Sequence, residues 1–467
     1  MTEDNPPGPP SGKPRVVIIG AGPAGLCAAA ALARQGCTVQ VFERRDHPDL
    51  IPSDAEDRAF VVGLNPRGRL ALSKAGFDLE AFEKPNLGVV PVRDVKAHHS
   101  GKKQGGVRFT FRMLLGDRMS WVRLMHEQVE GMRLDITCTF NAAFEGLDLQ
   151  GRCASIRRGE GPAEPVPFDL LVAADGVHSK VRASLAAALP PGQLTCSLEP
   201  APRLYKVIRD VPAEYFGGGG HVSQFHSRAP GDSPFGGFIM MVPRYEDGKL
   251  CGTLRMNEKG WEGLRSPADY EALIHTHFPH FPSACVPQVA AQLAERAAHV
   301  ASTRVSVSTF HGPGVVLIGD AAHAVFPLTG NGMNSALQDG AMLAELLAAH
   351  GGRLDEVPAA FTASRKVDAD ALLWLDKRAH TRSGFDGRWH PRYLLSHVQG
   401  AVRGVLERAT GGAVRPRVTS PLYESPDMRY SKIKRRLVVE DAATAAALLG
   451  AAAAVALWLV RRLGSAS

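Results

Sequence analysis

The segment from Arg15 to Asp46 constrains the fold of this chain more than any other. A short apolar run leads into a G-x-G-x-x-G sequence, an alanine- and leucine-rich stretch follows, and a second apolar run ends in an acidic residue. This order predicts a strand, a tight turn, a helix and a second strand, with a pyrophosphate at the helix N-terminus and ribose hydroxyls at the acid. The segment therefore predicts a dinucleotide site that includes Gly20, Gly22, Ala24, Gly25, Glu43 and Arg44.

A second segment with a strand-and-turn pattern lies near the middle of the chain. In FDLLVAADGVHSKVRASL, an apolar run ends in Asp175 and Gly176, and Ser179 and Arg182 follow at helical spacing. On its own this pattern is typical of many strand–turn–helix units. Together with the segment described next, it is expected to belong to the same ligand site.

A third segment, VVLIGDAAHAVFPLTGNGMN, combines an apolar strand with an acid, a proline and several glycines. The acid falls at the carboxyl end of the strand, where α/β sheets bind ligands and where a carboxylate can accept hydrogen bonds from a polyol chain. The helix expected after the loop directs its N-terminus, which favours negative charge, back toward the ligand. A reduced isoalloxazine ring is an anion, so the segment predicts a flavin site that includes Gly319, Asp320, Pro327, Gly330, Gly332 and Met333.

Cysteine spacing and charge exclude several other classes of protein. The seven cysteines are scattered and include no C-x-x-C pair, so neither a disulfide framework nor a zinc site is predicted, and no other metal cluster is recognised. The formal net charge of +7 is modest, and no basic stretch is interleaved with aromatic residues. No nucleic-acid partner is therefore expected.

The two ends of the chain differ in character. Residues 1–14 are rich in proline and glycine, which predicts a disordered N-terminal segment and not a signal peptide. Ala442–Val460 is uncharged and close to the ~20 residues that a bilayer core requires. Basic residues flank it on both sides, and Trp458 lies where an interfacial anchor is expected. This end predicts a membrane tail anchor, with a buried alanine-rich helix as the alternative.

The ordered set GAGPAG, DGVHSKVR and GDAAHAVFP…GNGMN resembles the single-chain FAD-dependent aromatic hydroxylases, which are flavin monooxygenases. Shorter matches in the same order, NPRGRLAL, FIMMVP, CGTLRM, KRAH and PLY, are similar to the kynurenine 3-monooxygenase branch. The resemblance covers residues 15–462. It implies an enzyme that uses NADPH and O₂ to hydroxylate a small aromatic substrate, with conversion of L-kynurenine to 3-hydroxykynurenine favoured.

The resemblance also implies further FAD contacts. Arg58 and Arg123 would lie near the phosphates and the ribityl chain, which Asp320 would bind. Met333 and Asn334 would lie against the flavin ring. NADPH would bind transiently at the surface near the Asp175 segment, because the chain has no second G-x-G-x-x-G. The oxygen chemistry would belong to the flavin, so no side chain is singled out as catalytic.

The implied fold class is α/β: an FAD-binding Rossmann-like domain of the glutathione-reductase type, with an inserted mixed β-sheet substrate domain, a helical C-terminal region and a C-terminal transmembrane helix. The expected boundaries are 1–14 for the disordered N-terminus, 15–197 and 301–366 for the two parts of the FAD-binding domain, 198–300 for the substrate-binding sheet, 367–440 for the helical region and 441–462 for the tail anchor.

The substrate site matches the resemblance less completely. Kynurenine-type relatives hold the substrate carboxylate with an arginine, two tyrosines and an asparagine. Arg93 in VVPVRDV is the nearest candidate arginine, and Tyr423 in SPLY matches one tyrosine. The second tyrosine falls in GGVRFTFRM, which has phenylalanines instead, and the asparagine position falls at Leu373.

Three functions therefore remain open on the sequence. The first is a tail-anchored NADPH-dependent hydroxylase of kynurenine or a close relative, with its catalytic body in the cytosol and, by resemblance, on the mitochondrial outer membrane. The second is a flavin monooxygenase or reductase of the same superfamily that acts on a membrane-soluble, isoprenoid-like lipid. The third is a flavin-binding membrane scaffold without turnover, against which the intact FAD motifs argue.

Overall fold

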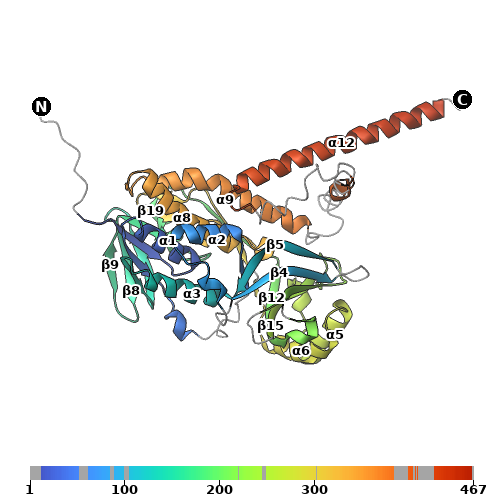
Figure 1. Cartoon of the computed structure of the whole chain (residues 1–467), viewed down its shortest axis with the longest axis horizontal. Coiled ribbons are helices and arrows are strands. Elements are labelled where there is room, and N and C mark those ends of the chain that lie inside the picture. The colour runs from blue at the N-terminus through green and yellow to red at the C-terminus, as the bar shows by residue number, and fades with distance from the viewer. Residues whose placement is uncertain are drawn as a thin grey trace.

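The computed structural model describes residues 12–51, 61–84, 89–98, 105–218, 220–243, 249–300, 302–382, 398–402, 405, 408 and 425–464. They form a helix-covered parallel sheet, a second large sheet beside it, and a long helix that leaves the body at the C-terminal end (Figure 1).

The first sheet has six strands, in the order β18-β19-β10-β1-β2-β6. All neighbours pair in parallel except the short edge strand β18. The inner strands are largely apolar and buried, with Arg15 and Gln40 as exposed exceptions. The bounds are β1 (Arg15–Ile19), β2 (Thr38–Phe42), β6 (Ile136–Thr139), β10 (Leu170–Ala173), β18 (His311–Gly312) and β19 (Val315–Leu317).

Helices α1 and α8 pack against each other beside this sheet. Gly340 makes the close approach possible, because a Cβ atom there would lie 2.7 Å from the backbone nitrogen of Ala28. The helices of this body are α1 (Pro23–Ala33), α2 (Pro66–Ala75), α3 (Arg118–Gly131), α4 (Lys180–Ala188), α7 (Asp320–His323), α8 (Gly332–Ala349) and α9 (Val357–Arg382). A three-stranded antiparallel sheet lies at its edge: β7 (Ala142–Asp148), β8 (Cys153–Arg158) and β9 (Ala163–Pro167).

The second sheet has eight strands, in the order β16-β12-β15-β14-β13-β4-β5-β3. Three of them precede the 198–300 segment in the chain, and β13 pairs in parallel with one of these, β4. The bounds are β3 (Val62–Leu64), β4 (Val89–His98), β5 (Gly105–Gly116), β12 (Arg203–Pro212), β13 (His221–His226), β14 (Gly237–Pro243), β15 (Lys249–Asn257) and β16 (His299–Val300). A separate pair, β11 (Cys196–Pro200) and β17 (Thr303–Val307), connects this sheet to the first body.

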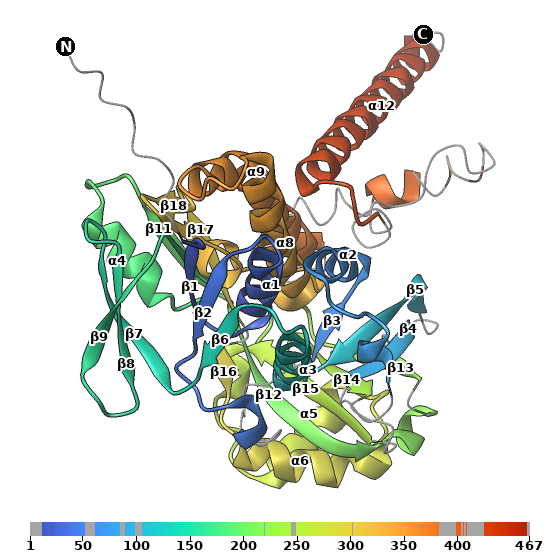
Figure 2. The same ribbon diagram turned by 60° about the vertical axis from the view of Figure 1, so that its left-hand side comes forward.

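The two faces of the eight-stranded sheet are covered differently. Helices α5 (Pro267–His277) and α6 (Val286–Glu295) lie on one face (Figure 2). There Leu254 and Met256 of β15 belong to the same apolar core as both helices. Met113, Val222 and Met240 form another apolar cluster of this sheet, outside that core. The alternation along the strands thus gives the sheet a second apolar face away from α5 and α6.

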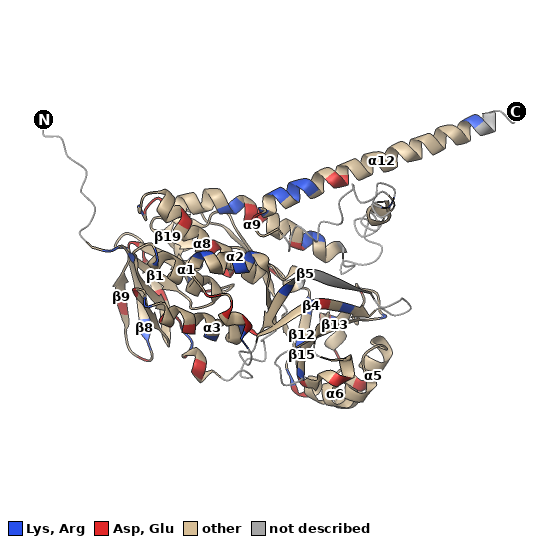
Figure 3. Ribbon diagram, in the orientation of Figure 1, with Lys and Arg blue, Asp and Glu red and all other residues tan. Residues whose placement is uncertain are grey.

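The C-terminal helix α12 (Tyr430–Gly464) is continuous from the body to its far end (Figure 1). Its first turns bury Tyr430, Ile433 and Leu437 against α9. Beyond Asp441 most apolar side chains are exposed, and basic residues lie before and after this stretch (Figure 3). Among the described residues, one helix is long and apolar enough to cross a membrane, and the predicted anchor segment is a direct extension of its docked part.

Candidate functional site

The turn after β1 needs glycine for steric reasons. Gly20 has φ +106°, and a Cβ atom there would lie 2.5 Å from the Ala174 carbonyl oxygen. A Cβ atom on Gly25 would lie 1.9 Å from the Gly20 carbonyl oxygen, so this glycine lets α1 begin close to the strand. At Gly22 the nearest atom would be an Arg118 nitrogen, at 4.0 Å. The backbone at Gly22 is therefore unobstructed, and a positively charged side chain lies near it. A phosphate site requires both features.

Glu43 lies directly after β2 and faces this turn. Its carboxylate accepts hydrogen bonds from the backbone nitrogens of Ala21, at 2.9 Å, and Arg45, at 3.1 Å. These bonds fix the carboxylate beside the glycine turn, and Arg44 next to it is exposed. Ala24, also predicted to belong to the site, is buried in the first turn of α1.

The turn after β10 leaves a buried acceptor free. One carboxylate oxygen of Asp175 accepts from the Val181 nitrogen at 3.1 Å, while the other, Oδ1, is buried and has no hydrogen-bond partner within the described part of the chain. Burial raises the pKa of Asp175. Gly176 follows with φ +84°, and a Cβ atom on it would meet no described atom within 4 Å. The turn thus offers an acceptor and open backbone.

Asp320 follows β19 and Gly319, and protein atoms surround its carboxylate as they would in a recess. Its side chain is exposed, yet nearby protein desolvates it and raises its pKa, an effect that Arg118 and His323 partly offset. An accessible carboxylate that is nevertheless poorly hydrated is suited to accept hydrogen bonds from a ligand that enters the recess. Gly319 adopts φ +57°, which a side chain would disfavour.

A buried ionic network beneath this turn was not predicted from the sequence. Asp339 of α8 accepts from the Gly319 nitrogen at 2.8 Å, lies 2.6 Å from His323 Nε2, and accepts from Arg365 Nε at 2.6 Å. Burial alone would raise the pKa of Asp339, but His323 and Arg365 together lower it below the usual value. The only sequence signal was an acid within a helix segment rich in apolar residues.

Arg182, at the third position of α4, connects the second and third predicted segments. Its guanidinium donates to the carbonyl oxygens of Ala321, at 2.8 Å, and Val177, at 2.9 Å. Arg182 is buried, so these bonds are shielded from water. They hold the Asp175 and Asp320 turns in one site.

The N-terminus of α8 is open toward the same region. Asn331, at the N-cap position, makes no side-chain capping bond and interacts with Asn65 instead. Asn334 is fully buried: its amide oxygen accepts from the Asn65 nitrogen at 2.9 Å, and its nitrogen donates to the carbonyls of Gly63 and Gly330, each at 2.8 Å. Asn334 therefore joins the α8 start to β3 of the second sheet, and its amide group is fully engaged within the protein.

The remaining predicted residues lie around this centre. Pro327 begins the 3-10 turn Pro327–Thr329, which ends at Gly330 with φ +61°. Gly332 is the first residue of α8, and Met333 follows it, partly buried. Arg123 of α3 donates to the carbonyl oxygens of Pro48, at 2.9 Å, and Ile51. Arg58 and Tyr423 lie outside the described residues.

The site as a whole fits an FAD molecule. Open glycine backbone beside an arginine suits the pyrophosphate, Glu43 suits the ribose, Asp320 suits the ribityl chain, and the uncapped N-terminus of α8 suits the anionic ring. The orphaned oxygen of Asp175 is a further acceptor in the same site.

Two arginines of the second sheet are candidates for a substrate anion. Arg93, the predicted one, is exposed and lies at a register irregularity of β4. Arg255 of β15 is only 8% exposed, because its neighbours Leu254 and Met256 face α5 and α6 and it points to the opposite face. There its guanidinium lies 5.4 Å from the ring centre of Phe238. Burial lowers the pKa of Arg255 to about 10.

Comparison with known families agrees with this geometry. Residues 122–365 match a family described as an FAD binding domain, and residues 18–59 match an NAD(P)-binding Rossmann-like domain. A kynurenine 3-monooxygenase from Salinispora arenicola is 32% identical over 373 residues, which are 77% of this chain and 77% of that protein. A violacein synthase from Chromobacterium violaceum is 28% identical over 381 residues, 77% of this chain and 83% of that protein.

Solved structures show the same fold. A 2-methyl-3-hydroxypyridine-5-carboxylic acid oxygenase superposes with a TM-score of 0.62 at 22% identity, over 82% of this chain and 96% of that one. The predicted α/β fold, with an FAD-binding Rossmann-like domain, mixed sheets and a helical C-terminus, is confirmed.

Proposed function

Because the chain belongs to the FAD-binding monooxygenase family, we propose that it uses NADPH and O₂ to hydroxylate an aromatic substrate, with L-kynurenine as the favoured one. The observation that carries this proposal is the recessed Asp320 beside the glycine turns, next to an apolar sheet face that contains the buried Arg255. The kynurenine 3-monooxygenase relative supports the choice of substrate.

The protein's own contribution would be to bind and orient FAD and the substrate and to exclude water from the site. FAD, when bound, supplies the redox and oxygen chemistry. Glu43 and the Gly20 turn would hold its adenosine half, while Asp320 and the α8 backbone would hold its flavin half. Asn334 ties α8 to β3 at Gly63, so the flavin half would lie beside the second sheet. The apolar face of that sheet would keep water from the reacting ring.

The substrate would lie between the flavin and this face. A Cβ atom at Gly63 would lie 2.7 Å from the Met113 sulfur, so the apolar cluster begins directly beside the α8 start. The same cluster contains Met240, which pairs with Thr253. Arg255, two residues further along β15, therefore shares this face. We propose Arg255 as a second anchor for a substrate carboxylate, beside the predicted Arg93.

The proposed reaction is tested by NADPH oxidation with purified flavoprotein. Oxidation should accelerate when L-kynurenine is added, and 3-hydroxykynurenine should accumulate in proportion. Acceleration by an isoprenoid-like lipid in detergent, with no response to kynurenine, would favour the lipid function. If neither compound accelerates NADPH oxidation, the protein hydroxylates neither kynurenine nor an isoprenoid-like lipid, and both functions are contradicted.

Steady-state kinetics on two arginine variants tests the carboxylate anchors. Arg255→Gln should raise the KM for kynurenine about ten- to a hundredfold with a smaller effect on kcat, because a charge-assisted bond of ~1.5–3 kcal/mol is made equally in ground and transition states. Arg93→Ala should do the same if Arg93 also contacts the carboxylate. Arg112→Ala, an exposed arginine of the same sheet, is the matched control. Unchanged KM values in both variants would remove these residues from the substrate site.

We further propose that α12 anchors the protein in a membrane, with its catalytic body in the cytosol. The exposed apolar stretch of this helix supports the proposal, as do the basic residues around it (Figure 3). Juxtamembrane basic residues add about 1 kcal/mol each near anionic lipid. In a cell with mitochondria, the family resemblance suggests the mitochondrial outer membrane.

Truncation after Glu440 should release the protein from membranes. The variant keeps Tyr430, Ile433 and Leu437, which dock α12 on α9, and loses the exposed stretch together with the Asp441–Arg378 ion pair. Full-length protein should remain in the pellet after carbonate extraction, and the truncated protein should move to the supernatant with its melting temperature nearly unchanged. Truncated protein that still sediments with membranes at high salt would show that another surface is the anchor.

A further inference from the structure

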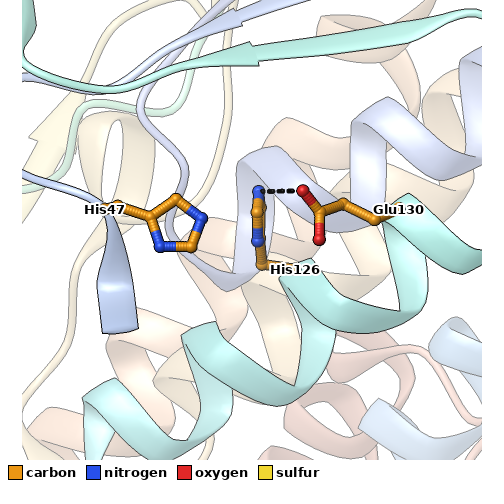
Figure 4. Close-up of side chains that lie close together, drawn as sticks. All are labelled: His47, His126 and Glu130. Carbon is orange, nitrogen blue, oxygen red and sulfur yellow. Dashed lines mark ion pairs between the residues drawn. The ribbon is translucent and has the colours of Figure 1, made fainter. Parts of the chain in front are cut away.

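The structure brings together three potential metal ligands that are far apart in the sequence. His47 follows β2, whereas His126 and Glu130 lie one turn apart on α3 (Figure 4). One ligand atom from each residue lies within 4.8 Å of the other two. The group is separate from Asp320 and the α8 start, and no step in the proposed reaction uses it.

The geometry of the group suits a small transition-metal ion. His126 Nε2 lies 3.9 Å from a carboxylate oxygen of Glu130, and the ring centres of the two histidines are 5.0 Å apart. Tetrahedral zinc with bonds of about 2.0–2.1 Å needs ligand atoms about 3.3 Å apart. The ligand atoms are up to 4.8 Å apart, so metal binding would require the exposed Glu130 and the partly exposed His47 to move closer to His126. Two imidazoles with one carboxylate select zinc-like ions over Mg²⁺ or Ca²⁺.

The surroundings hold the histidines in place. His126 is 3% exposed, and Phe140 contacts both imidazoles, with ring centres 4.8 and 5.0 Å away. Arg123, one turn before His126, donates to the carbonyl oxygens of Pro48 and Ile51 and fixes the His47 segment against α3.

A second-sphere partner is also present. A carboxylate oxygen of Asp49 lies 3.6 Å from Nδ1 of His47. The other ring nitrogen of His47 is directed toward His126 in Figure 4. In the structure Nδ1 accepts a hydrogen bond from the backbone nitrogen of Asp49 at 3.3 Å. Metal binding through the other ring nitrogen would require the tautomer with a proton on Nδ1, which would then donate a hydrogen bond to the Asp49 carboxylate. A carboxylate behind a ligating histidine is the usual second shell of such sites.

We propose that His47, His126 and Glu130 form a binding site for a zinc-class divalent cation, which would clamp the segment after β2 onto α3. Three protein ligands leave a fourth position for water, since Glu130 lies at the surface. The site would be structural: it would stabilise the end of the sheet that carries Glu43, without taking part in the hydroxylation.

Cobalt absorption tests the site independently of turnover. Tag-free full-length holoprotein, treated with chelator and desalted, should give visible Co²⁺ difference bands typical of tetrahedral coordination, saturating at one ion per chain, and Zn²⁺ should abolish them. Glu130→Gln and His47→Gln should each weaken Co²⁺ binding about tenfold or more. Both variants alter side chains with solvent exposure and should fold normally.

Glu127→Gln is the matched control, because Glu127 is an exposed glutamate on the same helix outside the group. It should bind Co²⁺ as the unaltered protein does. Zn²⁺ should also raise the melting temperature of the unaltered protein and of Glu127→Gln, but not of Glu130→Gln. The proposal is overturned if the unaltered protein shows no Co²⁺ bands at a hundredfold excess of metal, or if both ligand variants bind as tightly as the control.

Discussion

Replacing Asp320 with alanine is expected to give a protein that loses most of its yellow colour during gel filtration. The variant removes the recessed carboxylate proposed to accept from the ribityl chain, and each charge-assisted hydrogen bond contributes ~1.5–3 kcal/mol. Loss of one bond should weaken FAD binding about ten- to a hundredfold. The ratio of absorbance at flavin and protein wavelengths measures the result. Asp355→Ala, at an exposed position, should retain FAD.

The pKa of Asp320 adds a second, opposite effect. Because its folded-state pKa is raised, the folded apoprotein binds the proton more tightly than the unfolded chain, and stability falls as pH rises through that pKa. At neutral pH the desolvation of this carboxyl group therefore destabilises the apoprotein. Asp320→Asn should raise the melting temperature of the apoprotein while it weakens FAD retention. Stoichiometric FAD in either variant after gel filtration would refute the assigned role.

Asp339→Asn is expected to have the largest effect on stability. It leaves Arg365, almost fully buried, without its carboxylate, and removing one partner of a buried ion pair costs about 3–5 kcal/mol. Urea unfolding at neutral pH measures this change. Asp370→Asn is the control, since Asp370 pairs with Lys366 at the surface and should change the unfolding free energy by less than about 1 kcal/mol.

The pH dependence of this network has the sign opposite to that of Asp320. The folded-state pKa of Asp339 is lowered, so its contribution is complete above the pKa of the unfolded chain and is lost as pH falls through the folded-state pKa. The difference in unfolding free energy between the unaltered protein and Asp339→Asn should therefore shrink in acid. A difference that stays constant from neutral to strongly acidic pH would contradict the ionic account.

The sequence was most informative where structure is local. The Gly20 turn, the Asp175 turn and the Asp320 turn each follow a short apolar strand, and Gly20, Gly176 and Gly319 in them all adopt a positive φ that a side chain would disfavour. Such features can be predicted because neighbouring residues determine them. The α/β fold and the membership of the flavin monooxygenase family followed from these motifs and are confirmed.

Features that depend on distant partners could not be predicted in this way. Asp339 has the spacing of an ordinary helix residue, and only the fold brings His323 and Arg365 to it. The parallel pairing of β13 with β4 likewise depends on which strands the first body leaves free. His47 lies far along the chain from His126, so the sequence predicted no metal site, and our proposal of one rests on the folded geometry.

The docking of α12 has a mechanical consequence. The helix has no proline between Tyr430 and Gly464, so its 35 residues form a single rod about 50 Å long. A flexible linker would let the body tumble freely above a bilayer, whereas a rod packed on α9 acts as a stiff stalk. In a membrane, every copy of the protein would therefore present the same side of its body to the lipid surface, and compounds that partition into the bilayer would approach it from a single direction.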